Sequence, residues 1–139
     1  MKIYFAASIR GGREQQPKYE HLVNELRDKH DVLTEHFAES SLTSAGMTHL
    51  SDEEIFARDT AWIRESDVVV AELTQPSSGV GWETAYAESI GKKVIGLFDE
   101  SSERRLSAML AGNPEVNIIR YKDIGQAVVE LLDVLEPLE

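Results

Sequence analysis

The amino-acid sequence predicts an α/β fold: a five-stranded doubly wound parallel sheet, in a flavodoxin- or Rossmann-like three-layer sandwich. Three observations lead to this prediction. Short apolar runs alternate with longer amphipathic segments along the 139 residues, which is the order that β-α-β units produce. The runs at 3–7 and 67–71 are almost continuously apolar, as strands covered on both faces are. Glycines and polar turns separate the two kinds of segment.

Residue type and spacing predict the elements of the first half. Residues 3–7 form a first strand, and residues 17–29 form a helix with apolar side chains at helical spacing and Pro17 in its first turn. Residues 32–34 form a short second strand. Residues 37–50 are rich in Ser, Thr, Ala and Gly and are expected to form a loop or lid.

The same alternation continues in the second half. Ser51 and the acids after it have the form of a capping box, which begins a helix that runs to about residue 66. Three further strands are expected at 67–71, 94–98 and 116–121. Helices are expected at 79–90, 106–110 and 124–135, the first of them closed by Gly91.

Composition limits the classes of partner. The net charge of −11 argues against binding of nucleic-acid polymers or anionic membranes, because both favour basic surfaces. A small phosphorylated ligand is compatible with it, since one phosphate needs only a local cradle of N–H groups and one or two cations. The chain has no cysteine, which excludes disulfides and thiolate metal sites. With no membrane-length apolar run or signal-peptide pattern, the sequence predicts a single cytoplasmic domain over residues 1–139.

The turn after the first predicted strand carries groups that suit a phosphate. Two glycines let the backbone approach a ligand, while a hydroxyl, free N–H groups and a guanidinium supply hydrogen-bond donors. The alternative is a plain polar turn with a solvated arginine, and the segment matches neither the dinucleotide fingerprint nor the P-loop. Ligands of doubly wound sheets bind at the carboxyl ends of strands, so this turn is a candidate site. Its residues are Ser8, Ile9, Arg10, Gly11 and Gly12.

Two carboxylates form the candidate catalytic pair. Helical spacing places Asp59 between Ile55 and Ile63 on a buried helix face, where an acid needs a partner or keeps its proton. Glu83 is expected in the first turn of the helix after a glycine-rich segment, where the helix dipole favours its ionised form. The alternatives are an Asp that reaches solvent and a Glu that only stabilises a helix end. One protonated and one ionised acid suit glycosidic cleavage through an oxocarbenium-like state.

These residues together resemble the 2'-deoxynucleoside 5'-monophosphate N-hydrolases, which belong to the nucleoside 2-deoxyribosyltransferase superfamily. The resemblance runs in order over nearly the whole chain. It rests on Tyr4-Phe5, Ser8 to Gly12, Leu33 to His36, Asp59 with Trp62, Asp67 to Gly81 with Glu83, and Leu106 to Met109. Its most specific part is the Ser-Ile-Arg-Gly-Gly turn combined with Val-Ala-Glu-x-Thr-Gln-Pro-Ser.

The resemblance implies a role for each group. Glu83 would attack the anomeric carbon, Asp59 would assist the leaving base, and Tyr4 would orient the nucleophile. The implied substrate contacts are Ser8, Ile9, Arg10, Gly11, Gly12, Ser77 and Gly79, with His36 beside the base. Ser107, with Met109 nearby, would complete the phosphate site of the neighbouring subunit in a homodimer. No metal ion and no organic cofactor is expected.

The reaction implied by the resemblance is hydrolysis of a 2'-deoxynucleoside 5'-monophosphate to a free base and 2-deoxyribose 5-phosphate, by a retaining route. Tyr4 favours deoxyribose, because relatives that cleave ribonucleotides tend to carry Phe at its position. Three alternatives stay open at this point: base exchange on free deoxynucleosides, cleavage of ribonucleotides, and a nucleotide-sensing module with no chemistry.

Overall fold

The computed structural model describes residues 1–9, 15–35 and 50–139. It contains the predicted sheet of five parallel strands, in the order β2-β1-β3-β4-β5. The strands are β1 (Lys2–Ala6), β2 (Asp31–Leu33), β3 (Val68–Glu72), β4 (Lys93–Asp99) and β5 (Val116–Tyr121). The order reverses between β1 and β3, so the carboxyl ends of these two strands flank the switch point at which doubly wound sheets bind ligands.

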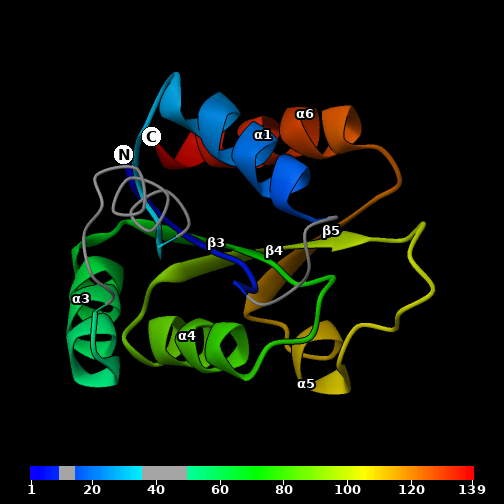
Figure 1. Ribbon diagram of the computed structural model, residues 1–139. Helices are drawn as coiled ribbons and strands as arrows, with labels where there is room; N and C mark the ends of the chain where they lie inside the picture. Colours follow the sequence, from blue (N-terminus) through cyan, green and yellow to red (C-terminus); the bar gives the residue numbers. More distant parts are fainter. Residues whose placement is uncertain (10–14, 36–49) are drawn as a thin grey trace.

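Helices cover both faces of the sheet, which gives the three layers visible in Figure 1. One face is covered by α1 (Gln16–Arg27) and α6 (Ile124–Leu135). The other is covered by α3 (Asp52–Glu65), α4 (Ser78–Ser89) and the short α5 (Ala108–Ala111). A 3-10 helix (Glu136–Leu138) follows α6. Every residue of β3 is buried, because helices shield both sides of this central strand.

Local sequence explains where two of the site-bearing helices begin and end. In the predicted capping box, the Ser51 hydroxyl accepts from the Glu54 N–H at 3.1 Å, and the Glu54 carboxylate accepts from the Ser51 N–H at 3.1 Å. Ser77 begins α4 by accepting a hydrogen bond from the Val80 N–H at 3.2 Å. Gly91, at φ +80°, follows the end of α4 in the left-handed conformation that glycine adopts without strain.

Most predicted boundaries differ from the observed ones by one or two residues, and two of these differences have a visible local cause. The helix predicted at 106–110 begins later, because Ser107 caps it by accepting from a backbone N–H. The strand predicted at 67–71 continues through Glu72, a fully buried acid that accepts hydrogen bonds from Tyr121 and from the turn after the strand. The predicted loop at 37–50 lies almost entirely outside the described residues.

Candidate active site

Tyr4 and Glu83 meet beside the carboxyl end of β1. Tyr4 lies on β1, on the sheet face that α3 and α4 cover, and it is only 1% exposed. Its hydroxyl donates a hydrogen bond to Glu83 Oε2 on α4. Gly79 lies beside Glu83 Oε1: a Cβ at this position would stand 4.0 Å away, so no side chain from position 79 covers this second oxygen. Packing therefore fixes the phenol, the phenol orients the carboxylate, and one carboxylate oxygen stays approachable.

A second group of charged side chains lies close by. Asp59, on α3, is 6% exposed and accepts a hydrogen bond from Arg58 Nε at 2.9 Å. Arg58 Nη2 lies 3.3 Å from Glu35 Oε1, so Glu35 and Asp59 both bind the same guanidinium. The Arg58 Cζ atom stands 4.7 Å from the centre of the Trp62 ring. One guanidinium, held by stacking on Trp62, thus joins two carboxyl groups.

All three carboxyl groups line one hollow of about 360 Å³, together with residues of α3 and α4. Its polar residues are these three acids together with Asp52 and Thr60. Phe56 and Trp82 supply an aromatic side, with 59% and 47% exposure and ring centres 5.5 Å apart. A hollow of this size, with apolar walls and a few convergent polar groups, suits a small organic ligand. The exposed rings are suited to stacking against a planar base.

Burial sets the protonation of these acids. Removal from water raises the pKa of Glu83 to about 7, and the charge of Asp59 acts in the same direction. The hydrogen bond from Tyr4 opposes this rise in the pKa of Glu83. Burial and then the charge of Asp59 raise the pKa of Glu35 to about 8. Near neutral pH, Glu83 is therefore partly ionised while Glu35 keeps its proton, which is the division that a nucleophile and an acid need.

The reason expected for the ionisation of Glu83 is wrong. Because α4 begins at Ser78, Glu83 lies in the second turn of the helix rather than the first. The helix N-terminus stabilises a charge mainly within the first turn, so its effect at Glu83 is weaker than expected. Burial then outweighs the hydrogen bond from Tyr4, and the pKa of Glu83 is raised. Asp59 lies on the buried face of its helix, as predicted.

Glu35 and Arg58 are site residues to which sequence reasoning gave no role. Glu35 follows β2 by two residues, at the sheet edge where parallel strands end. An acid at that place in the chain is a signal that could have indicated it. Arg58 had no such signal, because an arginine beside a helix acid is usually solvated. Its contacts depend on the tertiary packing of α3 beside the end of β2.

The predicted phosphate-binding turn is described only in part. Ser8 is 5% exposed and Ile9 is 42% exposed, so the chain passes from the core to the surface between them. Both follow β1, which pairs with β3 at the switch point. Three further residues of this turn, Arg10, Gly11 and Gly12, lie outside the described residues. His36, predicted beside the base, also lies outside them.

Three other predicted substrate contacts line a different hollow. Ser77, Ser107 and Met109 border a space of about 550 Å³ beside α4. The helix contributes Gly81 and Thr84 to this space, whereas Glu83 lines the hollow of the carboxyl groups. Within one chain, the structure therefore brings Tyr4, Asp59, Gly79 and Glu83 together and leaves Ser77, Ser107 and Met109 outside their hollow.

Among the residues described, no three or more His, Asp or Glu side chains are grouped so that they could hold a metal ion. The described helices include none that combines the length and the apolar character that crossing a membrane requires.

The chain is similar in sequence to named enzymes over most of its length. It matches the nucleoside 2-deoxyribosyltransferase family over residues 3–129. It is 44% identical to the 5-hydroxymethyl-dUMP N-hydrolase of Mus musculus over 131 residues, which cover 94% of this chain and 76% of that protein. It is 46% identical to the protein of the same name from Tetraodon nigroviridis over 132 residues, which cover 94% of this chain and 92% of that protein.

A solved structure shares the fold. The CMP N-glycosidase of Clostridium botulinum superposes with a TM-score of 0.72 at 22% identity, covering 97% of this chain and 100% of that one. The sequence match over residues 3–129 and the identity to the two N-hydrolases agree with this common architecture. The chain belongs to the nucleoside 2-deoxyribosyltransferase family.

Proposed function

We propose that the chain, as a single domain, hydrolyses the N-glycosidic bond of 2'-deoxynucleoside 5'-monophosphates to a free base and 2-deoxyribose 5-phosphate. The observation that carries this proposal is the Tyr4-bound carboxylate of Glu83 in the same hollow as Glu35 and Asp59, which both bind Arg58. The two relatives named as 5-hydroxymethyl-dUMP N-hydrolases support it, since their substrate is a nucleotide of this class.

In the first step, Glu83 acts as the nucleophile. Its Oε1 attacks the anomeric carbon while Oε2 stays bonded to the Tyr4 hydroxyl. The bond between the sugar and the base breaks, and the electron pair leaves with the base. The pair formed by Glu35 and Asp59 gives that base one proton. The products of this step are a neutral base and a glycosyl ester of Glu83.

In the second step, water hydrolyses the ester. The pair formed by Glu35 and Asp59, now short of one proton, takes a proton from the water as its oxygen attacks the anomeric carbon. The bond to Glu83 breaks, and Glu83 regains its charge. Each step inverts the anomeric carbon, so the overall configuration is retained. The enzyme ends in the protonation state in which it began.

We assign the 5'-phosphate to the turn after β1. Ser8 and Ile9 stand at the carboxyl end of that strand, at the switch point of the sheet. Arg10, Gly11 and Gly12 are assigned to the same contact from the resemblance of the turn. His36 is assigned to the base, next in the chain to Glu35.

We further assign a homodimer in which Ser107 and Met109 serve the site of the neighbouring copy. In their own chain these residues do not line the hollow that holds Glu83. Met109 is 82% exposed, and the exposed ring of Trp82 stacks on Tyr86 with ring centres 5.1 Å apart. Exposed apolar side chains of this kind favour contact with another protein surface, which supports a second copy.

Base release from a panel of nucleotides tests the proposed reaction. The chain is incubated with each 2'-deoxynucleoside 5'-monophosphate, including 5-hydroxymethyl-dUMP, and the free base is measured by chromatography. We expect release from at least one of them. No release from any member at equimolar enzyme contradicts the proposal. Two further substrate sets are assayed in parallel. Turnover only with free deoxynucleosides and a second base would identify base exchange. Turnover only with ribonucleotides would identify ribonucleotide cleavage.

A further inference from the structure

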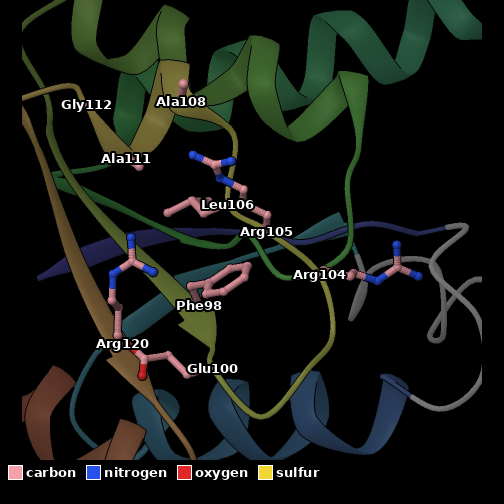
Figure 2. A pocket seen from close by; sticks show the side chains of 9 residues that line it. All are labelled: Phe98, Glu100, Arg104, Arg105, Leu106, Ala108, Ala111, Gly112 and Arg120. Carbon is pink, nitrogen blue, oxygen red and sulfur yellow. The ribbon is translucent and has the colours of Figure 1, made fainter.

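A third hollow, of about 590 Å³, lies near the carboxyl ends of β4 and β5 and is bordered by α5. We name it the arginine hollow, after Arg104, Arg105 and Arg120 in its lining; Phe98 and Leu106 form part of its floor. Figure 2 shows Arg105 and Arg120 on two different segments, with Leu106 between their guanidinium groups in this view, while Arg104 extends away at the rim.

These arginines have no acidic partner among the residues that the structure describes. None of the ion pairs found there, within 4.0 Å, includes any of the three. What distinguishes these three arginines is that they line one hollow, in a chain with 25 acidic residues and 14 lysines and arginines. Glu100 also borders the hollow, so three positive charges and one negative charge leave its lining with a net charge of +2.

Arg120 is held in place for binding. Its Cζ atom stands 5.7 Å from the centre of the Phe98 ring, and that ring is only 4% exposed. A buried ring cannot turn away, so stacking on it restricts the guanidinium and leaves the N–H groups at its edge free to donate. A restricted guanidinium, in a hollow that Arg105 also lines, can donate hydrogen bonds to the oxygens of a phosphate.

We propose that the arginine hollow binds a phosphate monoester at a site separate from the hollow that holds Glu83. A phosphate monoester dianion balances the net charge of +2, and the volume is within the range of pockets that enclose sugar phosphates and nucleotides. Arg105 and Leu106 also line the hollow beside Ser107. A ligand bound at Arg105 therefore contacts the segment that carries Ser107.

An NMR titration locates the binding. The 15N-labelled chain is titrated with ribose 5-phosphate in one arm and with adenosine 5'-monophosphate in another. We expect saturable shifts of the amide signals of Glu100, Leu106 and Ala111 and of the Nε–H signal of Arg120. Saturation by ribose 5-phosphate assigns the site to sugar phosphates in general, whereas saturation by the nucleotide alone assigns it to nucleotides.

Arg120→Gln is the decisive variant. It should weaken binding at these signals by about tenfold or more, because hydrogen bonds to a charged group are lost. The matched control is Lys93→Gln, which removes an exposed positive charge from the start of the neighbouring strand β4 and should leave binding unchanged. Base release should be the same in both variants, so failure of this inference is distinguishable from failure of the proposed reaction.

Three results would overturn the inference. These signals could stay unshifted with both ligands, or they could shift equally in the chain with Arg120→Gln. They could also change with protein concentration alone, in which case the hollow is an interface between copies of the chain.

Discussion

Tyr4 on β1 donates a hydrogen bond to Glu83 on α4, which lies 79 residues later in the chain. The contact joins the first strand of the sheet to the helix that follows β3, across the switch point. It lowers the pKa of Glu83, whereas burial raises it. The reactivity of Glu83 should therefore respond in a defined direction when either partner is changed.

Glu83→Gln should abolish base release. The amide is neutral and a poor nucleophile, so we expect kcat to fall by about a thousandfold or more. Nucleotide binding, measured by calorimetry, should persist, because the phosphate contacts are unchanged. The matched control is Glu88→Gln on the same helix, where the new amide keeps an oxygen that can accept from Asn113 Nδ2. Turnover by Glu83→Gln at the rate of this control would rule out Glu83 as the nucleophile.

Tyr4→Phe should slow turnover and shift its pH dependence. The variant removes a hydrogen bond to a charged group, which corresponds to about a tenfold loss or more at pH 7. Since that bond lowers the pKa of Glu83, its loss should raise the pKa. The acidic limb of kcat/KM, set by ionisation of Glu83, should move to higher pH, so the loss relative to the unchanged chain should become smaller as pH rises. A uniform loss at all pH values would instead indicate a packing defect.

Asp59→Asn and Glu35→Gln should each reduce kcat more than they raise KM. Both remove a carboxyl group from the pair that supplies and retrieves the proton, a contribution typically worth about a hundredfold or more. The two residues share the guanidinium of Arg58, so the double variant should lose less than the product of the single losses. Full multiplication of the two effects, in steady-state assays, would show that they act separately.

The stability of the fold should depend on pH through the buried acids. Their folded pKa values, about 7 for Glu83 and about 8 for Glu35, lie above the usual value of 4.5. The stability gained from protonation is thus fully present below pH 4.5 and is lost as pH rises through 7 and 8. The free energy of unfolding of the Glu83→Gln variant, relative to that of the unchanged chain, should therefore increase as pH rises from 5 to 9.

Urea denaturation at pH 5, 7 and 9 measures this trend. The control is Glu53→Gln on the exposed face of α3, which should follow the unchanged chain at each pH. A free energy of unfolding for Glu83→Gln that keeps a constant offset from the unchanged chain would show that Glu83 has no raised pKa in the folded state.

Mixed dimers test whether Ser107 serves the partner copy. Separately, Glu83→Gln and Ser107→Ala should each be impaired. After the two variants are mixed and allowed to exchange subunits, one site of each mixed dimer should combine an intact Glu83 with an intact Ser107. Activity should then exceed the sum of the separate activities. No gain, with exchange verified by native mass spectrometry, would place Ser107 in the site of its own chain or in none.

Sequence alone was sufficient to predict the architecture. Continuous apolar strands and the capping box of Ser51 predicted the parallel sheet and the start of α3, because these signals are local. Helical spacing also predicted that Asp59 is buried. Glu83 could be chosen as a candidate because it follows a glycine-rich turn at the end of a strand.

The electrostatics of the site could not be predicted in the same way. The protonation of Glu83 depends on its depth in the fold and on Tyr4, neither of which is a local property of its helix. The ion pair between Glu35 and Arg58 depends on how the end of β2 packs beside α3. Tertiary contacts of this kind have no periodic signal in the chain.

A crystal structure of Glu83→Gln with an intact 2'-deoxynucleoside 5'-monophosphate tests the central claim most directly. We predict that the anomeric carbon lies about 3 to 3.5 Å from the side chain at position 83, as a near-attack arrangement requires. The base should face Glu35 and Asp59, and the phosphate should lie at the turn after β1. An anomeric carbon bound outside the hollow of Glu35 and Asp59, out of reach of position 83, would contradict the account.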